Sequence, residues 1–321
     1  MRTLSVPALP ALLLAVAAFA VPLVFGANAY IMGLFVSGLI VSGVALAWAL
    51  LGNLGGMVSF GHAAFFGVGA YASALLSARS GLPVPLSLLA GGAVAALFSL
   101  AMLPALRLSG PYFALAILAY AHIFKILATE ASWLTGGSAG LARFPTLPTI
   151  AGIDFSSRLG SYWLLVAMVA ACAAIYLAVK RSHVGTALRA MAESEDATRV
   201  VGVNATLLKS WMLLLSAFIT GVFGAMNAHI INFLEPDYAF SGSWSVLPII
   251  AAIFGGYRTI LGPVAGAVLI YLFDQLVAKA LLPVGHQILL GVLLAGMILI
   301  APNGLFGLFG GKRKRAAHAA A

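Results

Sequence analysis

Residues 83–106, PVPLSLLAGGAVAALFSLAMLPAL, form a stretch of 24 residues without a charged side chain. At about 1.5 Å per residue, a helix of this length spans about 36 Å, more than the ~30 Å hydrocarbon core of a bilayer. Residues 8–25 form a second uncharged run of the same kind. A membrane-spanning strand needs only ~10 residues, and the backbone of any spanning segment must satisfy its hydrogen bonds internally. Runs this long therefore predict membrane-spanning helices rather than the strands of a barrel.

The composition indicates that most of the chain lies in lipid. Hydrophobic residues make up 63% of it and charged residues only 8%, whereas soluble domains are about 25% charged. We therefore expect an all-α polytopic protein embedded in a lipid bilayer. The net charge of +9 could attract nucleic acid, but the positive residues lie in short connections and near the C-terminal end. Membrane topology places them there, so we expect no nucleic-acid partner.

About ten transmembrane helices are expected, within a single transmembrane domain over 1–311 that is followed by a basic cytoplasmic tail at 312–321. With both termini in the cytoplasm, twelve of the 17 lysines and arginines fall inside and four outside, as the positive-inside rule requires. The segment at 245–257 is short, so an eight- or nine-span arrangement in which it is re-entrant is an alternative. The expected spans are 8–26, 29–51, 55–78, 83–106, 111–134, 161–179, 206–232, 245–257, 261–282 and 286–304.

The first twenty residues resemble a secretory signal, with Arg2, an apolar core and the sequence Ala18-Phe19-Ala20. Because many apolar spans follow, we interpret this segment as a retained first span. The single cysteine, Cys172, lies in an apolar run and excludes a disulfide within the chain.

Two long connections stand out, a periplasmic loop at about 135–160 and the charged segment KRSHVGTALRAMAESEDATRVVGVN at 180–204. The topology places the charged segment in the cytoplasm, where we expect a helix over about 183–204. It is either a solvated connector or a docking helix for a cytoplasmic partner. Its apolar residues recur at helical spacing: Val184, Ala187, Leu188 and Met191.

Five stretches carry motifs in a fixed order: GNLGGMVSFGHAAFFGVGAYASALL at 52–76, RLSGPYFALAILAYAHIFKIL at 107–127 followed by LTGGSAGL at 134–141, GTALRAMAESEDATRVVGVNATLLK at 185–209, FGGYRTILGPVAGA at 254–267 and LLGVLLAGMILIAPNGLFGL at 289–308. Together they resemble the branched-chain amino acid ABC transporter permeases of the LivM type. The resemblance covers roughly residues 30–310.

In such importers the cytoplasmic loop is the coupling helix, which sits in a cleft of the ATPase subunit. The resemblance therefore implies that four residues lie at an ATPase interface: Arg189, Glu193, Ala197 and Gly202. It also implies a second homologous permease subunit, two ABC ATPase subunits and a periplasmic substrate-binding protein as partners. ATP and Mg would be bound by the ATPase subunits, and we expect no cofactor in this chain.

No catalytic motif is readable. The tail sequence GLFGGKR has Phe306 where a phosphate-binding loop needs its first glycine, and Arg313 where it needs a hydroxyl. No Ser-His-Asp grouping or paired carboxylates can be read, and the six histidines lack metal-ligand spacing. We therefore expect that the chain is not an enzyme and holds no metal.

Polar residues inside predicted spans are the candidates for a translocation path. A polar cluster within a span is costly unless it faces a cavity or a neighbouring helix. At the start of the third span the alternatives are a path lining or a helix break on the one hand and a helix–helix hydrogen bond on the other, and the resemblance favours the path. The candidates there are Ser59, Gly61, His62, Phe65 and Tyr71.

Lys125 lies in the outer half of the fifth span, and two interpretations are open. Its long side chain can snorkel to the outer interface, or it faces the subunit interface and meets the carboxylate of a zwitterion. Just beyond this span, Thr135, Gly136 and Gly137 fit a helix stop. The resemblance makes them candidate contacts for the periplasmic binding protein.

The sequence thus predicts a multi-pass permease subunit in a bacterial inner membrane. It would translocate branched-chain or similar apolar amino acids, driven by ATP hydrolysis in its partners. Related permeases carry urea, short amides or sugars, which stay as alternatives. An ion-coupled secondary transporter is the alternative from another class, and it would need carboxylates buried in spans. Only Asp274 is well placed for that role.

Overall fold

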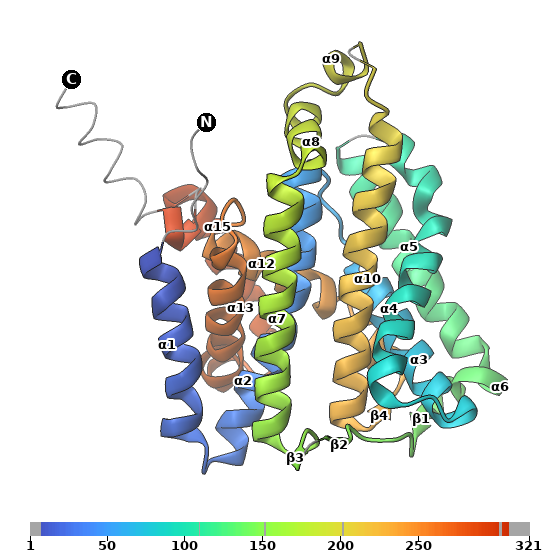
Figure 1. Ribbon diagram of the computed structural model, residues 1–321, viewed down its shortest axis with the longest axis vertical. Coiled ribbons are helices and arrows are strands. Elements are labelled where there is room, and N and C mark those ends of the chain that lie inside the picture. The colour runs from blue at the N-terminus through green and yellow to red at the C-terminus, as the bar shows by residue number, and fades with distance from the viewer. Residues whose placement is uncertain (1–7, 109, 151, 201, 302–303, 308–321) are drawn as a thin grey trace.

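The computed structural model describes residues 8–108, 110–150, 152–200, 202–301 and 304–307. Long helices that run roughly side by side make up most of it (Figure 1). The tail at 312–321 lies outside the described residues.

The first half of the described chain is helical apart from short connections. Its elements are α1 (Ala8–Phe25), α2 (Ala29–Ala49), the π-helix η1 (Leu50–Leu54), α3 (His62–Ser80), α4 (Val84–Ser99), the 3-10 helix η2 (Leu100–Arg107), α5 (Pro111–Glu130), α6 (Ser132–Thr135) and the 3-10 helix η3 (Gly137–Ala139).

Short strands and a projecting pair of helices follow. The elements are β1 (Leu141–Ala142), β2 (Thr149–Ile150), β3 (Ile153–Asp154), α7 (Arg158–Arg181), α8 (His183–Glu193), α9 (Glu195–Val200), α10 (Ala205–Ile231), β4 (Phe233–Leu234), α11 (Pro236–Ala239), α12 (Ser243–Gly255), α13 (Leu261–Phe273), the π-helix η4 (Asp274–Ala278), α14 (Lys279–Leu281) and α15 (His286–Ile300). β1 pairs antiparallel with β4, and β2 pairs antiparallel with β3.

The predicted all-α polytopic fold is confirmed. Among the described residues, eight helices are long and apolar enough to cross a membrane: Ala29–Leu54, Val84–Arg107, Pro111–Glu130, Arg158–Arg181, Ala205–Ile231, Pro236–Gly255, Leu261–Leu281 and His286–Gly307. The first and third predicted spans correspond to α1 and α3, which are helices outside this set of eight. The short segment at 245–257 belongs to a 20-residue unit that begins with α11.

The third predicted span begins later than expected, at residue 62 rather than 55. The preceding helix continues through η1 to Leu54, and the chain then runs without regular structure until α3 starts. Gly56 has a φ of +66°, a left-handed conformation that ends the helix and is open to glycine. Residues 56–61 therefore form a linker between two spans, which we call the 56–61 linker.

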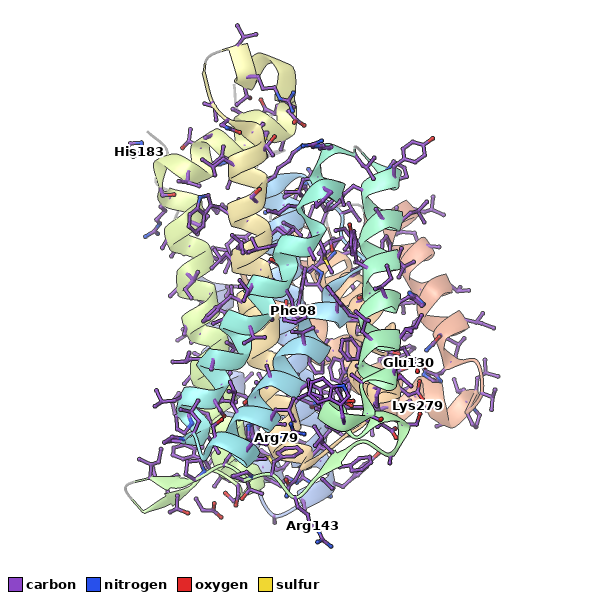
Figure 2. All side chains as sticks on the ribbon, turned by 90° about the vertical axis from the view of Figure 1, so that its right-hand side faces the viewer. Arg79, Phe98, Glu130, Arg143, His183 and Lys279 are labelled. Carbon is purple, nitrogen blue, oxygen red and sulfur yellow. The ribbon has the colours of Figure 1, made fainter. Side chains whose placement is uncertain are left out.

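The two ends of the molecule differ in character. The strands β1 to β4 lie at one end, while α8 and α9 project from the other (Figure 1). His183 marks the α8–α9 end, and Arg79 and Arg143 lie at the strand end (Figure 2). Arg79 and Arg143 therefore lie at the end of the molecule opposite the α8–α9 lobe (Figure 2).

Close helix packing in the core depends on glycine. α3 packs against α4 and α10, and a Cβ atom at Gly69 of α3 would lie 2.3 Å from the carbonyl oxygen of Gly221 on α10. Glycines permit this approach of two backbones, as is usual in membrane helix pairs. α2 is the most enclosed span, since 89% of its most apolar window is buried, against 19% for α15.

Candidate functional site

The α8–α9 lobe, residues 183–200, is tied to the membrane part by its own side chains. The Ser182 hydroxyl accepts a hydrogen bond from the Gly185 N–H and so caps α8. Arg189 donates from Nη2 to the carbonyl oxygen of Lys180, at 2.8 Å, and from Nε to that of Gly185, at 3.1 Å. The bond to Lys180 attaches α8 to the end of α7, whereas the bond to Gly185 lies within α8.

The expected single helix over 183–204 is two helices. Ser194 has an extended conformation, with φ of −156° and ψ of 108°, and separates α8 from α9. Half of the apolar stripe faces inward, since Leu188 and Met191 are buried, whereas Val184 is 45% exposed. Two of the four residues that formed a candidate docking stripe are therefore used for packing within the chain.

A salt bridge fixes α9 to the start of α10. Lys209 Nζ lies 2.5 Å from Glu195 Oε2, and Arg199 Nη2 lies 2.7 Å from Glu195 Oε1. The hydrogen bond from Lys209 is the main reason that the pKa of Glu195 is lowered, and Arg199 adds to the shift. The lobe is thus clamped at both ends, by Arg189 and by Lys209.

Three of the four predicted interface residues of the lobe are exposed in this chain. Arg189 and Glu193 are exposed, although Arg189 also holds α8 to α7 as described. Gly202 is exposed with a φ of +86° and has open space around it. Ala197 lies in α9, and its side chain is outside the described part of the structure.

Sequence reasoning missed Val200 at the end of α9. Its side chain is 86% exposed, which is unusual for a branched apolar residue at the tip of a projecting lobe. The sequence signal for Val200 is an apolar residue next to a charged segment, but the stripe of apolar residues at helical spacing ends at Met191 and does not include it.

A cavity of about 860 Å³ lies between the lobe and the spans. The 56–61 linker, the first two turns of α5 and the inner side of the lobe surround it. Glu193 is the predicted site residue that lines this cavity, and Glu195 and Lys209 line it as well. The cavity therefore adjoins both the lobe and the start of α5.

The polar candidates at the start of α3 are buried between helices. His62 Nε2 lies 3.0 Å from Ser216 Oγ, and the Ser216 hydroxyl donates to the carbonyl oxygen of Ala47. Ser59 accepts at its carbonyl oxygen from the indole N–H of Trp48, at 3.0 Å. These bonds connect α2, α3 and α10, and His62 Nδ1 has no hydrogen-bond partner among the described atoms.

The other candidates on α3 are enclosed too. A Cβ atom at Gly61 would lie 2.1 Å from Ile117 of α5. Phe65 is fully buried, and Tyr71 stacks on Phe240 with ring centroids 6.0 Å apart. None of Ser59, Gly61, His62, Phe65 and Tyr71 lines the 860 Å³ cavity.

Lys125 forms an ion pair that the sequence could not place. Its Nζ lies 2.6 Å from Oδ1 of Asp237, a residue in the first turn of α11. The side chains are 36% and 79% exposed, respectively. Snorkelling alone therefore does not describe the position of the ammonium.

Thr135 ends α6, Gly136 follows it and Gly137 begins η3, at the strand end of the molecule. The Thr135 hydroxyl lies 2.6 Å from the carbonyl oxygen of Ala128 and accepts from the Gly137 N–H at 3.1 Å. Gly136 has a φ of +79°. These contacts make the segment a helix stop, as one of the two interpretations predicted, and its role as a binding-protein contact stays a prediction.

No group of three or more histidine, cysteine, aspartate or glutamate side chains within the described ranges is arranged to hold a metal ion. A smaller charged group joins α14, η4 and the start of α15. There the buried Asp274 carboxylate lies 3.8 Å from His286 Nε2 and 4.0 Å from Lys279 Nζ.

Comparison with known proteins decides the family. The family model described as the permease component of the branched-chain amino acid transport system matches residues 30–302. The chain belongs to this family. The predicted resemblance is thereby confirmed, and the chain is a multi-pass membrane protein of a transport permease family.

Named relatives of this permease chain share about three residues in ten with it. The high-affinity branched-chain amino acid transport system permease proteins LivM of Salmonella typhimurium and Escherichia coli are 29% and 28% identical over 278 residues, which is 79% of this chain. The chain covers 64% of the length of each. A probable branched-chain amino acid transport permease protein LivH of Methanocaldococcus jannaschii is 31% identical over 152 residues, 44% of this chain and 46% of the relative. No solved structure matches the chain.

Proposed function

We propose that this chain is the membrane-spanning subunit of a binding-protein-dependent ABC importer for branched-chain or similar apolar amino acids in a bacterial inner membrane. The observation that carries the proposal is the family match over residues 30–302. The chain itself would provide the path, and ATP and Mg would be bound by partner ATPase subunits. A second homologous permease, two ATPase subunits and a periplasmic binding protein would complete the importer.

The α8–α9 lobe would be the part that receives work from the ATPase. A coupling element must make different contacts in two ATPase conformations, because only differential contacts shift an equilibrium. A lobe that projects from the spans and is held at both ends by Arg189 and the Glu195–Lys209 pair can transmit such a displacement to α7 and α10. Glu193, Val200 and Gly202 would then offer exposed surface to the ATPase.

The buried position of Ser59, Gly61, His62, Phe65 and Tyr71 limits how they can act in transport. In the described conformation they hold helices together. A role in the path requires a second conformation in which α3 moves relative to α10. Lys125, in contrast, is exposed already.

The test is copurification of the tagged chain from its native membrane in mild detergent. We expect an ATPase subunit to copurify, and to be lost when Glu193→Lys and Gly202→Trp are combined. The ligand of a copurifying binding protein would identify the substrate. It would show whether the importer carries apolar amino acids or instead urea, short amides or sugars.

A matched control exists at the strand end. Gly152, with a φ of +80° and open space around it, and the exposed Asp154 reproduce the chemistry of the lobe pair. Gly152→Trp with Asp154→Lys should leave the ATPase bound. Loss of the ATPase in both variants, or in neither, would contradict the assignment of the lobe.

A further inference from the structure

The ion pair of Lys125 and Asp237 lies at the surface of the chain, near the ends of the spans that carry the two residues. Lys125 is five residues before the end of α5, about 7.5 Å along the helix axis at about 1.5 Å per residue. Charged groups at such depth rarely face lipid, and instead face protein or water. Asp237 is nevertheless 79% exposed in this chain. Asp237 is the second residue of the span Pro236–Gly255, and an exposed ion pair so close to the end of a span is accessible to water or to a partner.

Lys125 belongs to a stripe that follows α5 from one end to the other. Spacings of three and four residues place six side chains on one face of this helix: Pro111, Leu115, Leu118, His122, Lys125 and Thr129. The outer half of the stripe is polar and the inner half is apolar. His122 is exposed, and its Nδ1 lies within hydrogen-bond distance of the carbonyl oxygen of Leu118 in the same helix.

The inner half of the stripe lines the 860 Å³ cavity. Pro111, Leu115 and Leu118 all contribute to its wall. One helix face thus connects an exposed ion pair near the strand end with the apolar side of a cavity whose opposite side, on the α8–α9 lobe, carries charged residues. This is the polarity that a path for an amino acid with an apolar side chain would need.

We infer that Lys125 and Asp237 bind the charged head of the transported amino acid. This inference rests on the proposed function. Lys125 would bind the carboxylate and Asp237 the ammonium group. A zwitterion carries both charges next to each other, so it can insert between the paired side chains and give each of them a new partner. Neither charge is then left unpaired, which keeps the cost of opening the pair low.

The experiment measures binding to the purified complex of this chain with its copurifying partners, in nanodiscs and without binding protein. The probes are leucine, 3-methylbutylamine, which lacks the carboxylate, and 4-methylpentanoate, which lacks the amine. Lys125→Gln should weaken binding of leucine and 4-methylpentanoate about tenfold, the loss of a charge-assisted hydrogen bond, and leave 3-methylbutylamine unchanged. Asp237→Asn should weaken leucine and 3-methylbutylamine and leave 4-methylpentanoate unchanged.

The control is Glu130→Gln, an exposed carboxylate at the end of the same helix, which should change none of the three affinities. If Lys125→Gln and Asp237→Asn weaken all three probes by the same factor, or change none, the pair is a structural ion pair and the inference is wrong. If the unaltered complex binds none of the three probes while its ATPase subunit is present, the proposed substrate class fails, and the inference fails with it.

Discussion

The Lys209 ammonium on α10 lies 2.5 Å from the Glu195 carboxylate on α9. The Lys209 side chain is only 13% exposed, so this ion pair is better shielded from water than most surface pairs. It joins the projecting lobe to one of the most enclosed spans of the molecule. Movement of α9 must therefore either pull on α10 or break this contact.

Glu195→Gln should loosen α9. A partly exposed ion pair stabilises by about 1 kcal/mol, which corresponds to a change of about fivefold in an opening equilibrium. Hydrogen exchange of the α9 amides should become faster by about that factor. Glu193→Gln, two residues away and outside this pair, should leave the exchange of α9 unchanged. Equal exchange in both variants would show that the pair does not hold the lobe.

The same pair predicts a pH dependence. Because the pKa of Glu195 is lowered, mainly by the Lys209 hydrogen bond, the stabilising contribution is complete above the ordinary value of 4.5. It declines as the pH falls below that value and is lost below the lowered pKa of the folded state. Protection of α9, corrected for intrinsic exchange, should therefore stay constant from pH 7 to about 5. Glu195→Gln should abolish the decline at lower pH, and a decline that begins above pH 6 would contradict this cause.

Gly69→Ala should destabilise the contact of α3 with α10. The new Cβ atom would lie 2.3 Å from the Gly221 carbonyl oxygen, so the two backbones must separate. Overpacking of this kind costs about 1–3 kcal/mol, and the midpoint of thermal unfolding in detergent should fall. Gly33→Ala is the control, since no atom lies within 4 Å of its added Cβ. Equal midpoints for the two variants would contradict the packing described for Gly69.

Val200→Asp should weaken the association with an ATPase subunit. Val200 is 86% exposed at the tip of α9, and a carboxylate there would have to lose its hydration in a protein interface. The copurified amount of ATPase should fall severalfold. Val284→Asp changes a residue that is 94% exposed in the connection before α15, and it should have no effect. Unchanged copurification with Val200→Asp would exclude this surface from the interface.

The positions of the spans could be predicted because a bilayer demands long apolar helices, and each of the ten predicted segments corresponds to a helix. Their ends could not be predicted as well. The third span starts at His62 because the chain turns at Gly56, and hydropathy does not distinguish an uncharged, mostly apolar linker from a helix. The break at Ser194 escaped notice for a similar reason, since serine is tolerated in helices and the charges on both sides fit one helical surface.

Contacts between residues far apart in the sequence could not be predicted. The sequence shows Lys125 as an unusual charge within a span, but Asp237 follows it by more than a hundred residues, so no local pattern predicts that the two meet. The pairing depends on α11 returning to the side of α5, which no local pattern encodes. The stripe of Leu188 and Met191 was recognised, yet only the packed structure decides that it faces the chain's own core.

The most direct test of the account is uptake of labelled leucine into proteoliposomes that contain the copurified complex. We expect uptake to require both ATP on the side of the ATPase subunits and the binding protein on the opposite side. Glu193→Lys combined with Gly202→Trp should abolish it, whereas Asp154→Lys combined with Gly152→Trp should not. Uptake by this chain alone, without ATP, would contradict the importer and assign an ion-coupled mechanism in which the buried Asp274 becomes the central residue.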